Sequence, residues 1–263
     1  MIPVFVCSYK RPNATFLKRS FDYKFPLYVF IREEDYSDYE YLLQRPNTKL
    51  VIVHDVTNLG DTRKKAVRYA VKKRFPKVFM FDDDISRLDL TQWDNGKARA
   101  SGTVKGCREN MDMVLETWES IWDDDIVISG ASYRPFAWGM KEQDINQTKR
   151  GQIQQCCGLN IKYLYKHRLN YRSNDLIGSE DLALQFEVMK NGGKAVIMNQ
   201  IQYDCPAMGV GTGGCCDGED LITKQHRRIK AFQSFYGDDP RYVVSTARSG
   251  VPSIKFNWKQ WRD

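Results

Sequence analysis

The strongest constraint on the fold is an unbroken apolar run that ends in three acidic residues. The run spans residues 78–81 and is followed directly by Asp82, Asp83 and Asp84. A strand that is apolar on both faces is typical of the middle of a parallel sheet that helices cover on both sides. Ligands of such sheets bind beyond the carboxyl ends of the strands, so these acids are expected at a ligand site.

The three aspartates are expected to bind a cation. Adjacent carboxylates repel one another where the dielectric constant is low, and a bound cation removes that repulsion. Ligands that are all oxygen atoms, on a short loop, favour Mg²⁺ or Mn²⁺ over zinc. A solvated acidic turn, in which Asp84 caps a short helix, remains as the alternative.

The first hundred residues predict repeated strand and helix units. Short apolar runs at 3–7, 27–31, 50–53 and 78–81 are each followed by a polar stretch long enough for a crossover. Helices are predicted at 61–74, 105–122, 179–191 and 220–235, and further strands at 126–129 and 153–159. Between these two strands, loops are predicted from the end of the first to about residue 151. The predicted fold class is therefore α/β: one Rossmann-like domain over residues 1–263, with a mostly parallel central sheet flanked by helices and a C-terminal extension.

Composition narrows the partners and the location. The chain has 40 Lys and Arg residues against 33 Asp and Glu residues, and the net charge of +7 favours an anionic partner such as a nucleotide or a nucleic acid. Its seven cysteines show neither zinc spacing nor a disulfide framework, which fits the reducing cytoplasm, or the host cytoplasm if the chain is viral. We expect no signal segment after Met1 and no membrane span, and the sequence indicates no obligate protein partner.

Two polar turns are candidates for nucleotide binding. The turn after the first strand contains Ser8, Tyr9 and Arg11, although an ordinary strand-to-helix loop explains it equally. Gly60 opens a helix whose first amides and Arg63 suit a diphosphate, with a solvent-exposed arginine as the alternative. No GxGxxG or Walker sequence occurs, which disfavours a dinucleotide-binding fold and a P-loop ATPase.

A later acidic pair is a candidate general base. Glu180 and Asp181 follow Ser179 in the first turn of a predicted helix. Acids at that position are also stabilised by the helix dipole, so helix capping is a competing explanation for the pair.

Taken in order, these clusters resemble the glycosyltransferases of the GT-A fold over roughly residues 3–200. Members of that superfamily open with a strand and a polar turn and place a Gly-x-x-Arg helix before the metal strand. They then carry an Asp-x-Asp motif and end the catalytic domain with a Glu-Asp helix. The matching residues here are Gly60 and Arg63, then Asp82-Asp83-Asp84, then Glu180-Asp181. The resemblance implies a donor half at 1–100 and an acceptor half with the C-terminal helix at 101–263.

The resemblance also implies roles for the donor half. Asp84 would bind Mn²⁺ or Mg²⁺ that bridges the donor diphosphate, Asp82 would share the metal or lie against the ribose, and Asp83 could contact the sugar. Arg63 and the metal would neutralise the departing nucleoside diphosphate. Many relatives recruit a histidine from the C-terminal segment, for which His226 is the candidate, although it suits a solvated helix face equally.

In the acceptor half, Asp181 would take the proton from the attacking hydroxyl group, with Glu180 as second choice, and a single displacement would invert the anomeric centre. The segments Asp-Asp-Asp-Ile and Ser-Glu-Asp-Leu resemble those of phage TET-associated and base J-type DNA glycosyltransferases. This implies a donor similar to UDP-glucose and, as the acceptor, a hydroxymethyl pyrimidine in double-stranded DNA. Loops at 133–151 and the basic, aromatic tail at 255–262 are candidates for contact with a flipped base.

Three other functions remain open. A cytosolic glycosyltransferase acting on a surface polysaccharide or a small molecule would share the donor half. A sugar-phosphate nucleotidyltransferase would need a glycine-rich N-terminal loop, and residues 7–12 contain no glycine. A non-catalytic nucleic-acid-binding protein would explain the positive charge but not the three aspartates.

Overall fold

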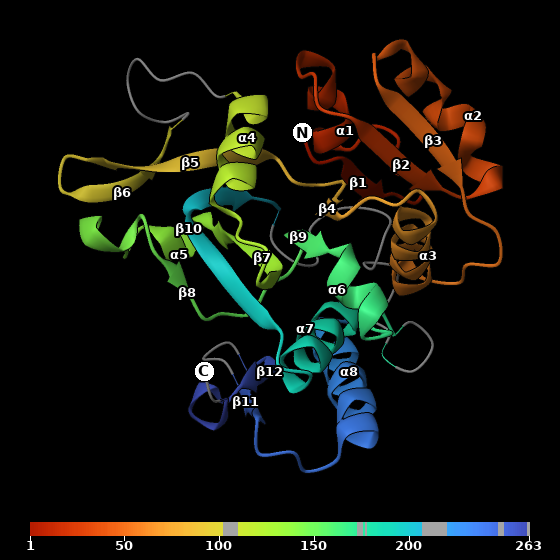
Figure 1. The fold of residues 1–263 in the computed structure, drawn as a ribbon. Helices are drawn as coiled ribbons and strands as arrows, with labels where there is room; N and C mark the ends of the chain where they lie inside the picture. The colour runs from red at the N-terminus through yellow and green to blue at the C-terminus, as the bar shows by residue number, and fades with distance from the viewer. Residues whose placement is uncertain (102–109, 173–175, 177, 207–219, 247–249, 262–263) are drawn as a thin grey trace.

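The structure is a computed structural model that describes residues 1–101, 110–172, 176, 178–206, 220–246 and 250–261. Strands and helices alternate through most of the chain (Figure 1). The strands are β1 (Val4–Cys7), β2 (Leu27–Ile31), β3 (Thr48–Ile52), β4 (Lys77–Asp82), β5 (Arg87–Asp94), β6 (Lys97–Ala100), β7 (Ile126–Tyr133), β8 (Thr148–Lys149), β9 (Cys156–Asn160), β10 (Lys194–Asp204), β11 (Tyr242–Thr246) and β12 (Pro252–Phe256). The α-helices are α1 (Thr15–Arg19), α2 (Tyr36–Tyr39), α3 (Leu59–Lys72), α4 (Met111–Ile121), α5 (Arg134–Ala137), α6 (Ile161–Lys166), α7 (Glu180–Lys190) and α8 (Leu221–Tyr236).

The central sheet has ten strands and is mostly parallel by strand direction. Its order is β3-β2-β1-β4-β9-β7-β10-β5-β6, with β8 paired to β10. Strands β1 to β4 pair in parallel. Strand β9 runs antiparallel to both β4 and β7, and β10 is parallel to β7, so β4, β7 and β10 all point the same way. Their carboxyl ends lie at one edge of the sheet, where ligands of such sheets bind.

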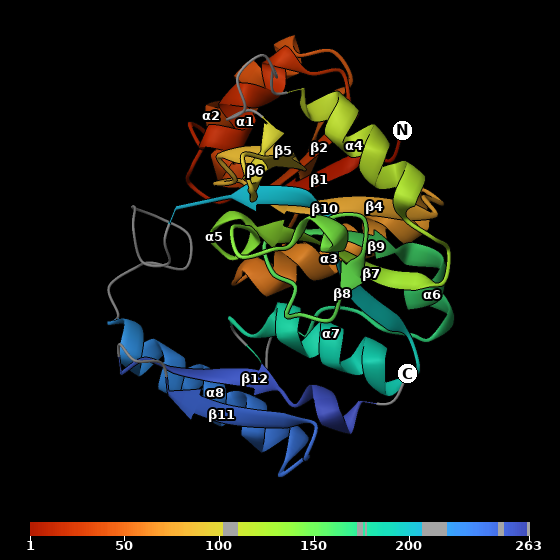
Figure 2. The same cartoon turned by 90° about the vertical axis from the view of Figure 1, so that its left-hand side faces the viewer.

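Helices cover both faces of this sheet, as Figure 2 shows with α1, α2 and α4 on one side and α3, α6 and α7 on the other. Alternate residues of a strand point to opposite faces. Val4 and Val6 therefore join the core beneath α1 and α4, whereas Phe5 and Cys7 join the core beneath α3. This two-sided burial explains why β1, β2 and β4 read as continuous apolar runs.

A third core lies between α7 and the C-terminal segment. Phe186 of α7 packs against Phe232 of α8 at a ring distance of 5.7 Å and against Trp261 at 5.2 Å. Phe256 and Trp261 are only 5% and 9% exposed. Packing of this C-terminal extension on α7 therefore explains the aromatic residues of the tail that the sequence suggested for base contact.

The α/β class, the mostly parallel sheet and the flanking helices are as predicted. Residues 105–109 of the helix expected at 105–122 lie outside the described part of the chain, and α4 forms the rest. The loops expected after residue 129 include the end of β7, the short helix α5 and strand β8. The division into a donor half and an acceptor half stays a prediction.

Candidate active site

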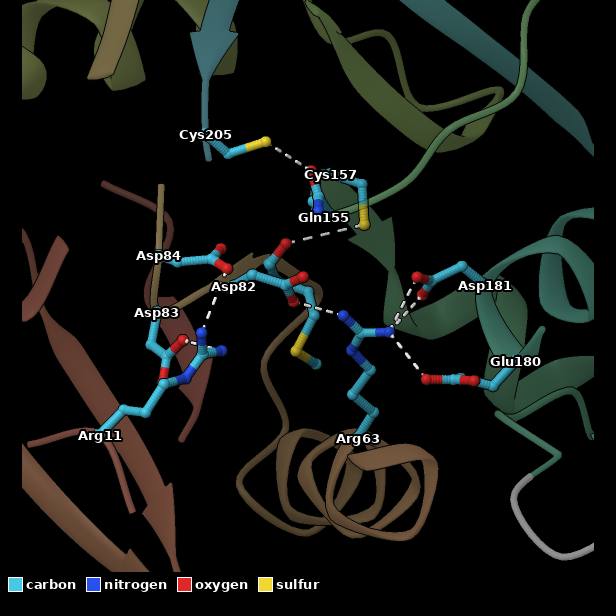
Figure 3. A network of polar contacts seen from close by, with 11 residues as sticks. Arg11, Arg63, Asp82, Asp83, Asp84, Gln155, Cys157, Glu180, Asp181 and Cys205 are labelled. Atoms are coloured by element: carbon cyan, nitrogen blue, oxygen red, sulfur yellow. Dashed lines mark hydrogen bonds and ion pairs between the residues drawn. The ribbon is translucent and has the colours of Figure 1, made fainter. Parts of the chain in front are cut away.

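The three aspartates lie where β4 ends, beside the turn after β1. Cys7 and Asp82 are partners in the parallel register, which places Ser8 next to the acids. Ser8 donates a hydrogen bond to Asp83, whose side chain is 1% exposed. Arg11 binds Asp83 at 2.6 Å and Asp84 at 3.3 Å (Figure 3). The structure therefore brings the predicted nucleotide turn and the predicted metal motif together.

Burial makes negative charge costly at this position. It raises the pKa of Asp83 to about 7, although Arg11 and the hydrogen bond from Ser8 oppose the shift. Burial and the neighbouring charge of Asp82 also raise the pKa of Asp84. A cation bound at these carboxylates would relieve this cost.

Arg63 lies at the centre of the second group of acids. Helix α3 carries it, and Asn58 caps that helix by accepting a hydrogen bond from the Asp61 amide at 2.9 Å. The guanidinium of Arg63 is 3% exposed and binds Asp82 through one nitrogen. The other terminal nitrogen lies 2.8 Å from both carboxylate oxygens of Asp181 and 3.2 Å from Glu180 (Figure 3). These ion pairs occupy both terminal nitrogens, so contact of Arg63 with a diphosphate stays a prediction.

Asp181 and Glu180 reach Arg63 from the first turn of α7. Ser179 occupies the N-cap position, and its side chain makes no capping hydrogen bond. A small pocket beside Asp181 is lined largely by apolar side chains, among them Ile128 and Leu184. Burial raises the pKa of Asp181 to about 7, with Arg63 opposing the shift. That value is near the range in which a carboxylate works as a general base at neutral pH.

Two residues that the sequence did not single out complete the site. The Gln155 carbonyl accepts a hydrogen bond from the Asp82 amide at 2.8 Å, and its side chain lies 2.9 Å from the Cys205 thiol. Gln155 has a φ of 54°, an uncommon conformation for a residue with a side chain, and such conformations cluster at functional sites. The Tyr39 hydroxyl lies 2.7 Å from the Ser8 hydroxyl and accepts a hydrogen bond from the Arg11 amide at 3.0 Å. A lone glutamine and a lone tyrosine carry no motif, so only the fold reveals them.

The remaining predicted residues are more dispersed. Gly60 is buried in the first turn of α3. The Tyr9 ring packs under the Arg32 guanidinium at 3.9 Å. His226 is exposed on α8, and Figures 1 and 2 both show α7 between α8 and β4. The structure therefore does not bring His226 to the aspartates, and its role as a metal ligand stays a prediction.

Three further features of the described residues concern metals, thiols and membranes. No group of three or more His, Cys, Asp or Glu side chains there is arranged to hold a metal ion. The described cysteines, Cys7, Cys156, Cys157 and Cys205, are buried free thiols. None of the described helices is long and apolar enough to cross a membrane.

Comparison with solved structures shows the fold. Staphylococcus aureus TarS, residues 1–349, matches with a TM-score of 0.50 and 13% identity, over 89% of this chain and 72% of that one. GalNAc-T7, solved with UDP, GalNAc and Mn²⁺, matches with a TM-score of 0.52 and 8% identity, over 90% of this chain and 48% of that one. Both are GT-A glycosyltransferases, which confirms the GT-A-like fold. No curated protein matches the sequence.

A family model identifies the chain more specifically than these folds do. The model that describes TET-associated glycosyltransferases matches residues 2–214, a range that contains the three aspartates, Arg63 and the Glu180-Asp181 pair. With the acids of β4 and α7 gathered around Arg63 on a GT-A scaffold, the chain is a glycosyltransferase and belongs to the TET-associated glycosyltransferase family.

Proposed function

We propose that this glycosyltransferase moves a sugar from a nucleoside-diphosphate sugar, similar to UDP-glucose, to a hydroxymethyl pyrimidine in DNA. The observation that carries the proposal is the convergence of Asp82 from β4 and Asp181 from α7 on Arg63. The donor-side acid Asp82 and the acceptor-side acid Asp181 thus lie on either side of the Arg63 guanidinium, at the carboxyl edge of the sheet.

The donor side fits a divalent cation. Asp82 and Asp84 offer only oxygen atoms, which suits Mn²⁺ or Mg²⁺. Among the described residues, one carboxylate oxygen of Asp84 (Oδ1) is buried without a hydrogen-bond partner, and a cation would satisfy it. Asp82 and Asp84 would hold this metal, which would supply positive charge to stabilise the diphosphate leaving group. The Mn²⁺ bound in GalNAc-T7 supports this assignment.

The turn after β1 is assigned to the nucleotide. Its register with β4 and the contacts of Ser8 and Arg11 keep these two residues beside the aspartates. Tyr9, whose ring packs under Arg32, is assigned to the same turn. Arg11 is 28% exposed and already binds Asp83 and Asp84, so its guanidinium lies where a diphosphate would approach. Gly60 is buried in the first turn of α3 and is assigned to the same donor side.

Asp181 is assigned as the general base. It takes the proton of the acceptor hydroxyl as that oxygen bonds to the anomeric carbon. The bond from this carbon to the diphosphate oxygen breaks, and its electron pair leaves with the nucleoside diphosphate. One displacement of this kind inverts the anomeric centre. Glu180 is the less suitable base because its side chain is only 5% exposed, against 23% for Asp181.

An aromatic surface formed by α5 and the residue that follows it supports a nucleic-acid acceptor. Phe136 and Trp138 are 74% and 59% exposed, and the Arg134 guanidinium lies 6.0 Å from the Trp138 ring. Arg134 also binds Asp204 at 3.0 Å, and the Asp204 carbonyl accepts a hydrogen bond from the Ser86 amide at 2.8 Å, just after the aspartates. Exposed aromatic rings beside cations suit bases that are drawn out of a stack.

Mass spectrometry of DNA nucleosides tests this proposal. The protein is incubated with Mn²⁺, a panel of nucleoside-diphosphate sugars and matched duplexes with or without hydroxymethylcytosine. We expect a hexose to be added only to the hydroxymethylated duplex. Release of nucleoside diphosphate without modified DNA, together with transfer to a carbohydrate or small alcohol, would contradict the DNA acceptor. Pyrophosphate formed from a sugar phosphate and a nucleoside triphosphate would indicate a nucleotidyltransferase instead.

A further inference from the structure

The guanidinium of Arg63 joins acids from two separate elements. One terminal nitrogen binds Asp82 at the end of β4, and the other binds Asp181 and Glu180 at the start of α7. A guanidinium is planar and presents its N–H groups in a fixed fork, so it holds groups on different sides in a defined geometry. Figure 3 shows it between the two acidic groups, on the stem that α3 supplies.

Three carboxylates surround the single positive charge of Arg63. Asp82, Glu180 and Asp181 share one buried cation, and among the described residues Glu180 Oε2 has no hydrogen-bond partner. Burial raises the pKa of the thiols of Cys7 and Cys157, so neither adds a negative charge. Among the described residues, the titratable groups that interact with Asp181 are Arg63 of α3, Glu180 of α7, Asp82 of β4, Cys157 of β9, Cys7 of β1 and Tyr171. Of these, Arg63 carries the positive charge. The Arg228 guanidinium of α8 lies against Gly178, just before this turn of α7.

We propose that Arg63 is a positioning residue that fixes the acceptor-side base Asp181 relative to the donor-side acid Asp82 and favours the ionised form of that base. This proposal rests on the proposed function, because it assigns Asp181 and Asp82 to the two sides of one transfer. It gives Arg63 a role that needs no contact with the substrate.

A conservative substitution separates this role from a merely structural one. Arg63→Lys keeps the charge, but a single ammonium does not bind both groups in the same fork. A misplacement of about 1 Å costs roughly 100-fold in rate, so we expect kcat to fall about 100-fold. The KM for the donor should change by less than about threefold, because Asp82 and Asp84 keep their places on β4.

The pH profile supplies the second readout. Arg63→Met removes the positive charge next to Asp181, so the acidic limb of the kcat/KM profile should move to higher pH by at least about one unit. Arg63→Lys should shift that limb less, because its charge remains. A residue that serves only stability would leave the position of the limb unchanged.

Arg45 offers a matched control. It is equally buried, at 1% exposure, but it donates to the backbone carbonyls of Ser20 and Phe25 and contacts none of these acids. Arg45→Lys should lower the melting temperature and leave the acidic limb in place.

The outcomes distinguish the two levels of the proposal. No metal-dependent release of nucleoside diphosphate by the unmodified protein would refute the proposed function itself. An active protein whose Arg63→Lys variant keeps kcat within about threefold, or whose Arg63→Met variant keeps the acidic limb, would overturn only the role of Arg63. If circular dichroism shows that the Arg63 variants are unfolded, Glu180→Gln decides. It removes an anion that competes for the guanidinium, so the limb should move to lower pH, and an unmoved limb would overturn the proposal.

Discussion

Replacing Asp181 by Asn tests the assignment of the base. The amide keeps the shape of the side chain and can still accept a hydrogen bond from Arg63, but it cannot take a proton in the reaction. With the pKa of Asp181 raised to about 7 by burial, about one molecule in ten carries the ionised base at pH 6 and about nine in ten at pH 8. The kcat/KM of the unmodified protein should therefore rise about tenfold between these pH values.

Asp181→Asn should lose most of the transfer rate and also the increase in kcat/KM between pH 6 and pH 8. General base catalysis contributes about 10²- to 10⁴-fold, so release of nucleoside diphosphate at pH 8 should fall by a factor in that range and show no acidic limb. The assay is a coupled measurement of diphosphate release from pH 5.5 to 8.5 with Mn²⁺ and acceptor. A variant that keeps the tenfold rise, or more than about a tenth of the original rate, would refute the assignment.

The melting temperature of Asp181→Asn serves as a control, because this variant should lose activity at pH 8 without losing stability. The pKa of Asp181 lies above its ordinary value of 3.8, so the native state binds this proton more tightly than the unfolded state does. The contribution of Asp181 to stability is therefore favourable at low pH and is lost as pH rises through about 7. Asp181→Asn should melt at or above the temperature of the unmodified protein at pH 8, and the difference should shrink toward pH 5. A lower melting temperature at pH 8 would show that the loss of activity reflects unfolding.

Three further variants have distinct expected results. Asp84→Asn should weaken Mn²⁺ binding in calorimetry and lower turnover by at least about 100-fold. The melting temperature of this variant should change little, because the Asp84 side chain is 27% exposed and its ion pair with Arg11 is 3.3 Å long. Unchanged Mn²⁺ affinity would contradict the metal assignment. Phe136→Ala with Trp138→Ala should raise the KM for DNA roughly tenfold or more, since stacking contributes about 1–3 kcal/mol per base, and should leave donor hydrolysis without DNA unchanged. Trp118→Ala should lower the free energy of unfolding by about 3–5 kcal/mol in urea titrations. The Trp118 side chain is fully buried, and its ring centroid lies 5.0 Å from that of Phe79 on β4. A loss below about 1 kcal/mol would contradict this packing.

The parallel half of the fold could be predicted because its strands are buried on both faces. The run at 78–81 and the run at 27–31 have no polar residue, and β4 and β2 occupy those positions. The hairpin of β5 and β6 went unpredicted although its turn carries a signal. Asn95 and Gly96 have φ values of 49° and 75°, as the turn of a two-residue hairpin requires. The direction of β9 could not be predicted, since an apolar run reads the same in either direction.

The acids of the site could be predicted, but not their counterions. Three adjacent aspartates and a Glu-Asp pair are visible in the sequence, whereas the partners of an arginine depend on how distant elements pack. Arg63 and Asp181 are 118 positions apart and meet only because α3 and α7 cover the same face of the sheet. The packing thus places Arg63 among carboxylates, where the sequence suggested a diphosphate.

The proposed function requires the acids of β4 to use a divalent cation in the transfer of a sugar from a nucleoside-diphosphate donor. Its most direct test is release of nucleoside diphosphate from UDP-glucose and related donors, with hydroxymethylated duplex DNA present, in Mn²⁺ and then in excess EDTA. We predict release in Mn²⁺ that EDTA abolishes and that added Mn²⁺ restores. Release at the same rate in EDTA, or no release from any donor in Mn²⁺, would contradict the proposed function.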